Sequence, residues 1–253
     1  MDHKRITLFA GHYGSGKTNI AVNYALLLAR EGKRTAIADL DIVNPYFRTK
    51  DSAAELEEAG VDLISPQFAN SNVDLPALPA EAYRLVEDRG LFAVMDIGGD
   101  DRGAYALGRY TPFILDEDDY RMAFVANPCR PLTRTPEEAL EVMREIEAAG
   151  GLPFTAIVNN ANLAHETTPE TVLAAVPYME KLSCLSGLPV WMTCAEESAA
   201  AGLAGKVPGL LPMRLQTKYF DLQEQGEPWS AGPVVGRQPN DGPRPPKARP
   251  LFG

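Results

Sequence analysis

Short apolar runs alternate along the chain with longer segments in which apolar residues recur every three or four positions. This alternation is typical of a parallel β-sheet wrapped by helices. The apolar runs predict strands near residues 6–10, 35–39, 61–65, 91–96, 122–126, 154–159 and 190–194. The periodic segments predict helices over residues 18–31, 51–59, 79–88, 136–149, 169–186 and 196–204. The sequence therefore predicts an α/β fold, with a mostly parallel sheet of about seven strands and helices on both faces, a three-layer sandwich.

Several element boundaries have a local physical reason. Gly32 and the pair Gly150–Gly151 follow predicted helices, where a left-handed backbone costs glycine little. Thr135 precedes Pro136, which fits a helix cap with proline at the first helical position, and Glu138 is spaced to complete a capping box.

The pattern stops near Gly226. The last 28 residues contain seven prolines and five glycines. Such a segment cannot bury enough apolar surface to offset its ordering entropy. We expect one folded domain over residues 1–225 and a disordered or polyproline-like tail over residues 226–253, with a proline-rich ligand for a partner domain as the alternative.

Composition and charge exclude several protein classes. The 253 residues are 45% hydrophobic and 23% charged, as in a soluble domain with a sizeable core. No apolar run approaches the roughly 20 residues of a membrane helix, and no apolar leader precedes the first strand, so we expect a cytoplasmic protein. The net charge of -10 disfavours nucleic acid as a ligand. The three cysteines are far apart, so a zinc site or disulfide framework is not expected.

The segment GHYGSGKT, from Gly11 to Thr18, matches the phosphate-binding pattern G-x-x-x-x-G-K-[ST]. An apolar strand leads into it and a helical segment leads out, as the pattern requires. In such a loop consecutive backbone N–H groups face phosphate oxygens, the lysine adds a charge and the hydroxyl binds Mg²⁺. The predicted nucleotide contacts are Gly11, Gly14, Ser15, Gly16, Lys17, Thr18 and Asn19.

Carboxylates at two predicted strand ends fit the same chemistry. Asp96 ends one strand and is followed by Ile97-Gly98-Gly99, as a Walker B acid is followed by a switch. Asp39 and Asp41 end another strand, where alternate residues share a face. We expect Thr18, Asp39 and Asp96 at the metal, Lys17 and Asp41 as catalytic residues, and Asp41 to position an attacking water. Helix-cap or turn acids are the alternative for each aspartate.

The segment Asn159-Asn160-Ala161-Asn162 follows a predicted strand, where many P-loop GTPases have N-K-x-D. Asn162 is neutral and cannot reproduce the carboxylate that accepts hydrogen bonds from guanine, so adenine is favoured. Turn formation is the alternative function of these asparagines.

With these residues, the chain resembles the MinD/ParA-type branch of P-loop ATPases, the SIMIBI class, and especially the group named CobQ/CobB/MinD/ParA nucleotide-binding domain. The resemblance covers roughly residues 4–205 and rests on GHYGSGKT, IADLDIVNPYFR, MDIGGDDRGAYALGRY and the strand order. It implies ATP and Mg²⁺ binding, slow hydrolysis, and nucleotide-dependent dimerisation or partner docking. It also implies a base contact from Asn160.

One position departs from this family. MinD and ParA proteins have a second lysine early in the loop, which reaches across the dimer, and here that position is His12. Histidine is largely neutral at pH 7, so it does not replace a permanent cation. Arg48 and Arg102 are the candidates for the missing charge, with solvated arginines as the alternative.

Three functions are compatible with these motifs. The favoured one is a Mg-dependent ATPase that acts as a nucleotide-dependent switch for a protein partner or a second copy, without nucleic acid or membrane. The alternatives are an ATP-dependent ligase or kinase of the dethiobiotin synthetase type and a non-hydrolysing nucleotide-binding adaptor. The sequence has no evident motif for a second substrate, which favours the switch.

Overall fold

A computed structural model describes residues 2–40, 52–64, 80–98, 106–163 and 166–215. Within these residues the strands form one eight-stranded sheet in the order β3-β2-β4-β1-β5-β6-β7-β8. Every neighbouring pair is parallel. The strands are β1 (Ile6–Ala10), β2 (Thr35–Leu40), β3 (Asp62–Ile64), β4 (Phe92–Ile97), β5 (Tyr120–Ala126), β6 (Ala156–Asn159), β7 (Val190–Glu196) and β8 (Leu210–Met213).

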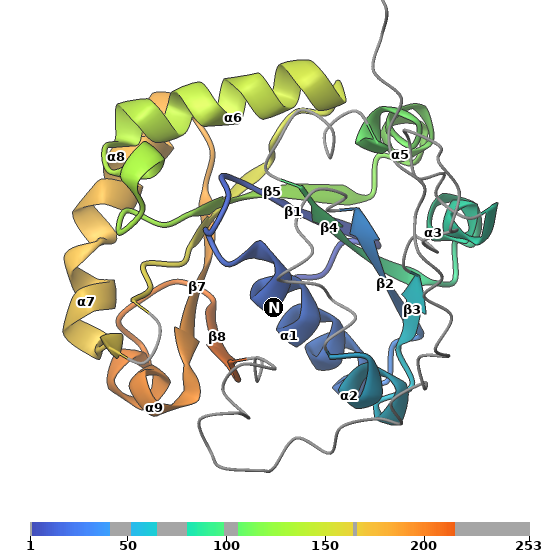
Figure 1. The fold of residues 1–253 in the computed structure, drawn as a ribbon, viewed down its shortest axis with the longest axis horizontal. Helices are drawn as coiled ribbons and strands as arrows, with labels where there is room; N and C mark the ends of the chain where they lie inside the picture. The colour runs from blue at the N-terminus through green and yellow to red at the C-terminus, as the bar shows by residue number, and fades with distance from the viewer. Residues whose placement is uncertain (1, 41–51, 65–79, 99–105, 164–165, 216–253) are drawn as a thin grey trace, which may run out of the picture. The chain divides into compact units, whose positions relative to one another are not determined.

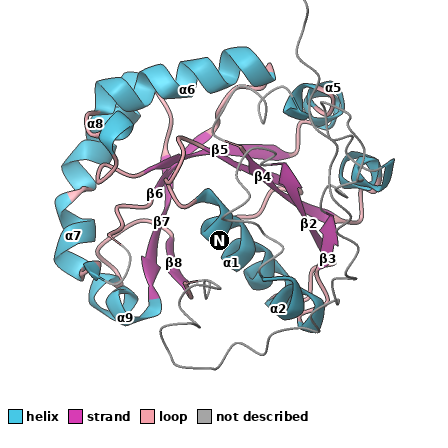
Figure 2. Ribbon diagram, in the orientation of Figure 1, coloured by secondary structure: helices cyan, strands magenta, loops and turns pink. Residues whose placement is uncertain are grey.

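Helices cover both faces of the sheet (Figure 1). They are α1 (Lys17–Arg30), α2 (Ala53–Glu58), α3 (Arg84–Glu87), α5 (Thr111–Glu117), α6 (Pro136–Gly150), α7 (Pro169–Ala174), α8 (Val176–Ser186) and α9 (Glu197–Ala200). Helices α1 and α2 pack on one face, and α3, α5, α6 and α8 pack on the other. Figure 2 shows the sheet between these two helical layers. The predicted α/β sandwich is therefore confirmed.

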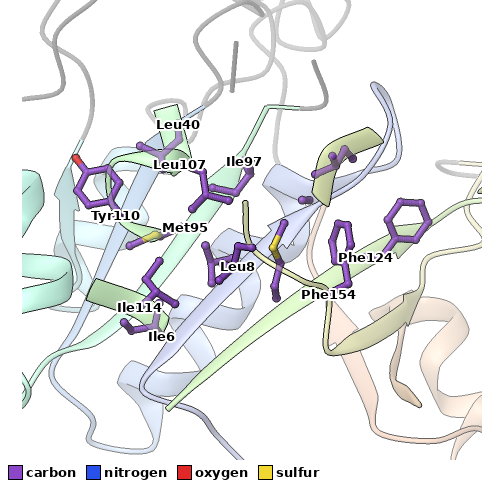
Figure 3. Packing of buried hydrophobic residues seen from close by; sticks show 14 of the residues in the cluster. Ile6, Leu8, Leu40, Met95, Ile97, Leu107, Tyr110, Ile114, Phe124 and Phe154 are labelled. Carbon is purple, nitrogen blue, oxygen red and sulfur yellow. The ribbon is translucent and has the colours of Figure 1, made fainter. Parts of the chain in front are cut away.

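Successive side chains along a strand point to opposite faces of the sheet, so the hydrophobic core consists of two clusters, one on each face. In β1, Ile6 and Leu8 belong to the cluster under α3, α5, α6 and α8, while Phe9 belongs to the cluster under α1 and α2. Figure 3 shows the first cluster, in which Met95 of β4 packs beside its register partner Leu8, and Phe124 lies against Phe154. Burial of both faces explains why the strands read as continuous apolar runs.

Two predicted boundary devices are confirmed. The Thr135 hydroxyl accepts a hydrogen bond from the Glu138 amide, and the Glu138 carboxylate accepts one from the Thr135 amide, which completes a capping box for α6. Gly32 and Gly151 have φ of 77° and 65°, the left-handed conformation expected after a helix.

The observed elements differ from the predicted ones in three places. The sheet has an eighth strand, β8, because a four-residue strand containing Pro212 at the sheet edge gives little sequence signal. Helix α5 was missed, since Pro112 lies in its first turn, where proline is tolerated but resembles a helix breaker. The helix predicted over residues 169–186 is two helices, which meet at Ala175 just before Pro177.

The chain divides into two units, Met1–Gln216 and Thr217–Gly253. The second unit lies wholly outside the described residues. The boundary expected at residue 225 and the expected tail over residues 226–253 therefore stay predictions.

Candidate functional site

The loop between β1 and α1 lies at the carboxyl edge of the central part of the sheet. Strand β1 lies between β4 and β5. Strands β2 to β4 lie on one side of β1, and the strands from β5 onward lie on its other side, so the direction in which strands are added reverses at β1. In open α/β sheets this reversal of strand order marks the place where ligands bind. The position of the Gly11–Thr18 loop thus agrees with that expected of a phosphate-binding loop.

Glycines in the loop are required by its backbone. Gly14 and Gly16 have φ of 75° and 93°, in the left-handed region that disfavours side chains. A Cβ on Gly11 would lie 2.7 Å from the carbonyl oxygen of Val125, and one on Gly16 would overlap the side-chain amide of Asn160. The loop therefore packs closely against the ends of β5 and β6.

Lys17 is the first residue of α1, and it is buried, with 5% of its surface exposed. Its Nζ donates a long hydrogen bond of 3.4 Å to the carbonyl oxygen of His12. Across the described ranges no carboxylate lies within ion-pair distance of this ammonium group. A buried positive charge is thus held beside the loop backbone.

Most loop amides have no acceptor among the residues that the structure describes. The Ser15 amide donates to the His12 carbonyl at 3.1 Å, which closes a turn inside the loop. Within the described residues, the amides of Gly14, Gly16, Lys17 and Thr18 make no hydrogen bond. Backbone donors of this kind, next to a buried ammonium group, suit an anion.

The predicted metal-binding residues come together at the neighbouring strand ends. Asp39 of β2 and Asp96 of β4 are register partners, and both are buried. The Thr18 hydroxyl donates a hydrogen bond to Oδ2 of Asp96 at 2.5 Å. Two carboxylates and a hydroxyl are hard oxygen donors, which Mg²⁺ prefers in combination with phosphate oxygens. This donor set fits Mg²⁺.

No group of three or more His, Cys, Asp or Glu side chains that could hold a metal by themselves occurs among the described residues. Asp41, the predicted water-positioning residue, lies outside the described residues, as do Arg48 and Arg102.

Asn160 holds the backbone of the Gly11–Thr18 loop through a side-chain hydrogen bond. It is buried, and its Nδ2 donates a hydrogen bond of 2.6 Å to the carbonyl oxygen of Ser15. Its own amide donates to the carbonyl of Ala126 at the end of β5. Asn160 therefore ties the phosphate-binding loop to two other strand ends. A contact from Asn160 to a nucleotide base stays a prediction.

Asn127, directly after β5, is a structural element of the site that the sequence analysis missed. Its Oδ1 accepts hydrogen bonds from the amides of Cys129 and Asn162, at 3.0 and 3.4 Å, and its Nδ2 donates to the carbonyl of Asn162. These bonds join the loops after β5 and β6. Its position, a polar residue directly after an apolar strand, is the sequence feature that could have identified it.

Three further residues lie at the rim of the loop. Asn19 is partly buried in the first turn of α1, and its carbonyl accepts a hydrogen bond from Asn23. His12 is partly exposed, and its Nδ1 lies 3.0 Å from the carbonyl of Tyr13. The Arg130 side chain, from the loop after β5, lies beside Gly14.

The described part of the chain contains no helix with the length and apolar character needed to cross a bilayer. No family model matches the chain, and no curated protein matches it.

Solved structures are similar to the chain. The cell division protein FtsY from Thermotoga maritima has a TM-score of 0.51 at 16% identity, over 78% of this chain and 64% of that one. The signal recognition particle 54 kDa protein from Aeropyrum pernix, in complex with GDP, has a TM-score of 0.46 at 20% identity, over 73% of this chain and 40% of that one. FtsY from Elizabethkingia anophelis has a TM-score of 0.46 at 15% identity, over 76% of this chain and 59% of that one.

This chain thus spans 40–64% of the length of these proteins. At such identities the likeness concerns the fold, and the FtsY structure from Thermotoga maritima carries it. The chain therefore shares the α/β fold of that FtsY structure. The resemblance of the motifs to the MinD/ParA subgroup stays a prediction.

Proposed function

We propose that this chain binds ATP with Mg²⁺ in the Gly11–Thr18 loop, hydrolyses it slowly and acts as a nucleotide-dependent switch for a protein partner or a second copy of itself. The observation that supports this most is the buried ammonium group of Lys17, at 5% exposure. Nucleotide binding is the first part of the proposal, and hydrolysis and switching depend on it.

An anion explains the burial of Lys17. Moving an ammonium group out of water costs several kcal/mol unless an opposite charge or good hydrogen bonds compensate. Here a hydrogen bond of 3.4 Å to the His12 carbonyl compensates weakly. A phosphate group in the loop supplies the opposite charge and also accepts hydrogen bonds from the loop amides.

The proposed metal residues are supported by the same geometry. Thr18, Asp39 and Asp96 are the residues that would hold Mg²⁺ or orient its water ligands. When bound, Mg²⁺ neutralises charge that develops on the transferred phosphate. Asp41, which follows β2 in the sequence, is proposed to orient the attacking water.

Adenine is the proposed base because Asn162 stands where a carboxylate would bind guanine. The structure of the 54 kDa protein from Aeropyrum pernix contains GDP. Guanine nucleotides are therefore the necessary comparison in every binding measurement.

The switch and the MinD/ParA subgroup are the finer parts of the proposal. They are supported by the sequence, in which Asp39 and Asp96 end strands and precede segments of the kind that a γ-phosphate orders in nucleotide switches. His12 in place of the second lysine distinguishes this chain from the subgroup.

Calorimetric titration with ATP and GTP, with Mg²⁺ and with EDTA, tests the proposal. We expect wild type to bind ATP more tightly than GTP, and Lys17→Ala to lose binding while it keeps its circular dichroism spectrum. Lys181→Ala is the matched control, since it removes an exposed ammonium group on α8 that pairs with Glu137. Unchanged ATP affinity in Lys17→Ala contradicts the proposal.

Turnover separates the switch from its alternatives. Basal ATP hydrolysis that Asp41→Ala abolishes supports the switch. Turnover that needs a small acceptor molecule supports a ligase or kinase, and tight binding with no turnover supports an adaptor.

A further inference from the structure

A second cation lies at the rim of the phosphate-binding loop. Strand β5 pairs with β1 along its length, from Ile6↔Tyr120 to Ala10↔Phe124. The segments that follow these two strands therefore leave the sheet side by side. Arg130 lies on the segment after β5 and is exposed.

The backbone of Arg130 is held in place. Its amide donates to the carbonyl of Asn127 at 3.1 Å, and its carbonyl accepts from the amide of Thr133 at 3.3 Å. The Thr133 hydroxyl donates to the same Asn127 carbonyl at 2.8 Å. This turn fixes the point from which the arginine side chain extends.

The side chain extends to the phosphate-binding loop. Its Nε and Cδ lie 3.8 and 4.0 Å from the point where a Cβ on Gly14 would stand. In the described part of the chain, no carboxylate pairs with this guanidinium and no aromatic ring covers it. A planar group with five N–H donors is therefore available beside the loop.

The chemistry of the group indicates its ligand. A guanidinium matches the geometry of phosphate oxygens, to which it donates paired hydrogen bonds. The chain carries a net charge of -10, so a local cation matters for an anionic ligand. His12 supplies no permanent charge at its position in the loop.

We infer that Arg130 binds the phosphate chain of the nucleotide from the Gly14 side of the loop, as a second cation beside Lys17. This inference rests on the proposed nucleotide binding. It assigns to the segment after β5 a contact with the ligand, which the sequence motifs do not include.

The test compares Arg130→Gln with Arg134→Gln. Both variants remove one exposed guanidinium from the same segment, and Arg134 lies next to the Thr135 cap of α6. Each protein is titrated with Mg-ATP, Mg-ADP and adenosine at low and high salt, after thermal denaturation has confirmed that it is folded.

We expect Arg130→Gln to weaken Mg-ATP binding about tenfold at low salt and less at high salt. Adenosine binding should not change, Arg130→Lys should recover part of the affinity, and Arg134→Gln should remain within about twofold of wild type.

Two results overturn the inference alone. Unchanged ATP affinity in Arg130→Gln, with binding still lost in Lys17→Ala, shows a solvated surface arginine and leaves the proposed function intact. An equal loss of ATP and adenosine affinity shows a contact with the nucleoside rather than the phosphates. Absence of nucleotide binding by wild type overturns both the inference and the proposed function.

Discussion

The Thr18 hydroxyl donates a 2.5 Å hydrogen bond to Oδ2 of Asp96, which joins the first turn of α1 to the carboxyl end of β4. The two residues are separated by 78 positions in the sequence. The phosphate-binding loop and the proposed metal site are therefore one connected structure.

This connection predicts a metal-dependent phenotype for Asp96→Asn. The amide keeps the shape of the side chain but removes the charge that attracts Mg²⁺. We expect the gain in ATP affinity on adding Mg²⁺ to fall by about tenfold or more, with a much smaller change in EDTA. Calorimetry in the two conditions measures the difference. Equal losses with and without Mg²⁺ would mean that Asp96 acts on the loop alone.

A second prediction concerns the cost of burying Lys17. Lys17→Met replaces the buried ammonium group with an apolar side chain of similar length, so the ligand-free protein should become more stable. We expect a gain of about 1–2 kcal/mol, which raises Tm by a few degrees in a chain of this size. The variant should lose the further rise in Tm that ATP gives wild type.

Differential scanning fluorimetry with and without Mg-ATP measures both effects. A lower Tm of the ligand-free variant would indicate that the protein itself compensates the Lys17 charge. Lys181→Met, on the surface of α8, is the control for the chemistry of the substitution.

Asn160→Ala tests whether this residue supports the loop or binds the base. Loss of the 2.6 Å hydrogen bond leaves the buried carbonyl of Ser15 without that donor, at a cost of about 1–3 kcal/mol. We expect weaker binding of ATP and of inorganic tripolyphosphate by a similar factor, because both ligands need the same loop. A loss confined to ATP would instead identify a base contact.

Gly16 and Gly187 have similar backbone conformations but different surroundings, so replacement by alanine should lower the free energy of unfolding by different amounts. Gly187 has φ of 74° and nothing within 4 Å of an added Cβ, so Gly187→Ala should cost about 1 kcal/mol from backbone strain. Gly16 has φ of 93°, and its added Cβ would overlap the Asn160 amide. We expect Gly16→Ala to cost at least about 2–3 kcal/mol and to abolish nucleotide binding.

Denaturant unfolding of both variants measures the two costs. In the double variant Gly16→Ala/Asn160→Ala the overlap is absent, so the combined cost should be smaller than the sum of the single costs. Additive costs would show that the strain at Gly16 comes from its backbone alone.

The sequence predicted those parts of the site that depend on local pattern. The phosphate-binding loop has a fixed spacing, and Asp39 and Asp96 end apolar strands, so their shared edge follows from the parallel sheet. Thr135 and Glu138 formed the capping box that their spacing indicated.

Contacts between residues that are far apart in the sequence could not be predicted from it. The bond from Asn160 to Ser15 spans 145 positions, and nothing in either segment specifies the partner. The place of Arg130 beside Gly14 depends on the pairing of β5 with β1, which a single sequence does not determine. Strand β8 contains Pro212 and lies at the edge of the sheet, so its short apolar pattern resembles a loop.

The hydrogen bond from Asn160 to the Ser15 carbonyl makes the shape of an N-terminal motif depend on the C-terminal half of the sheet. A fragment that ended before β6 would contain every letter of GHYGSGKT and still lack the side chain that holds its backbone. If the chain binds nucleotide as proposed, its affinity is thus a property of the assembled sheet, and it would report on whether the later strands had folded.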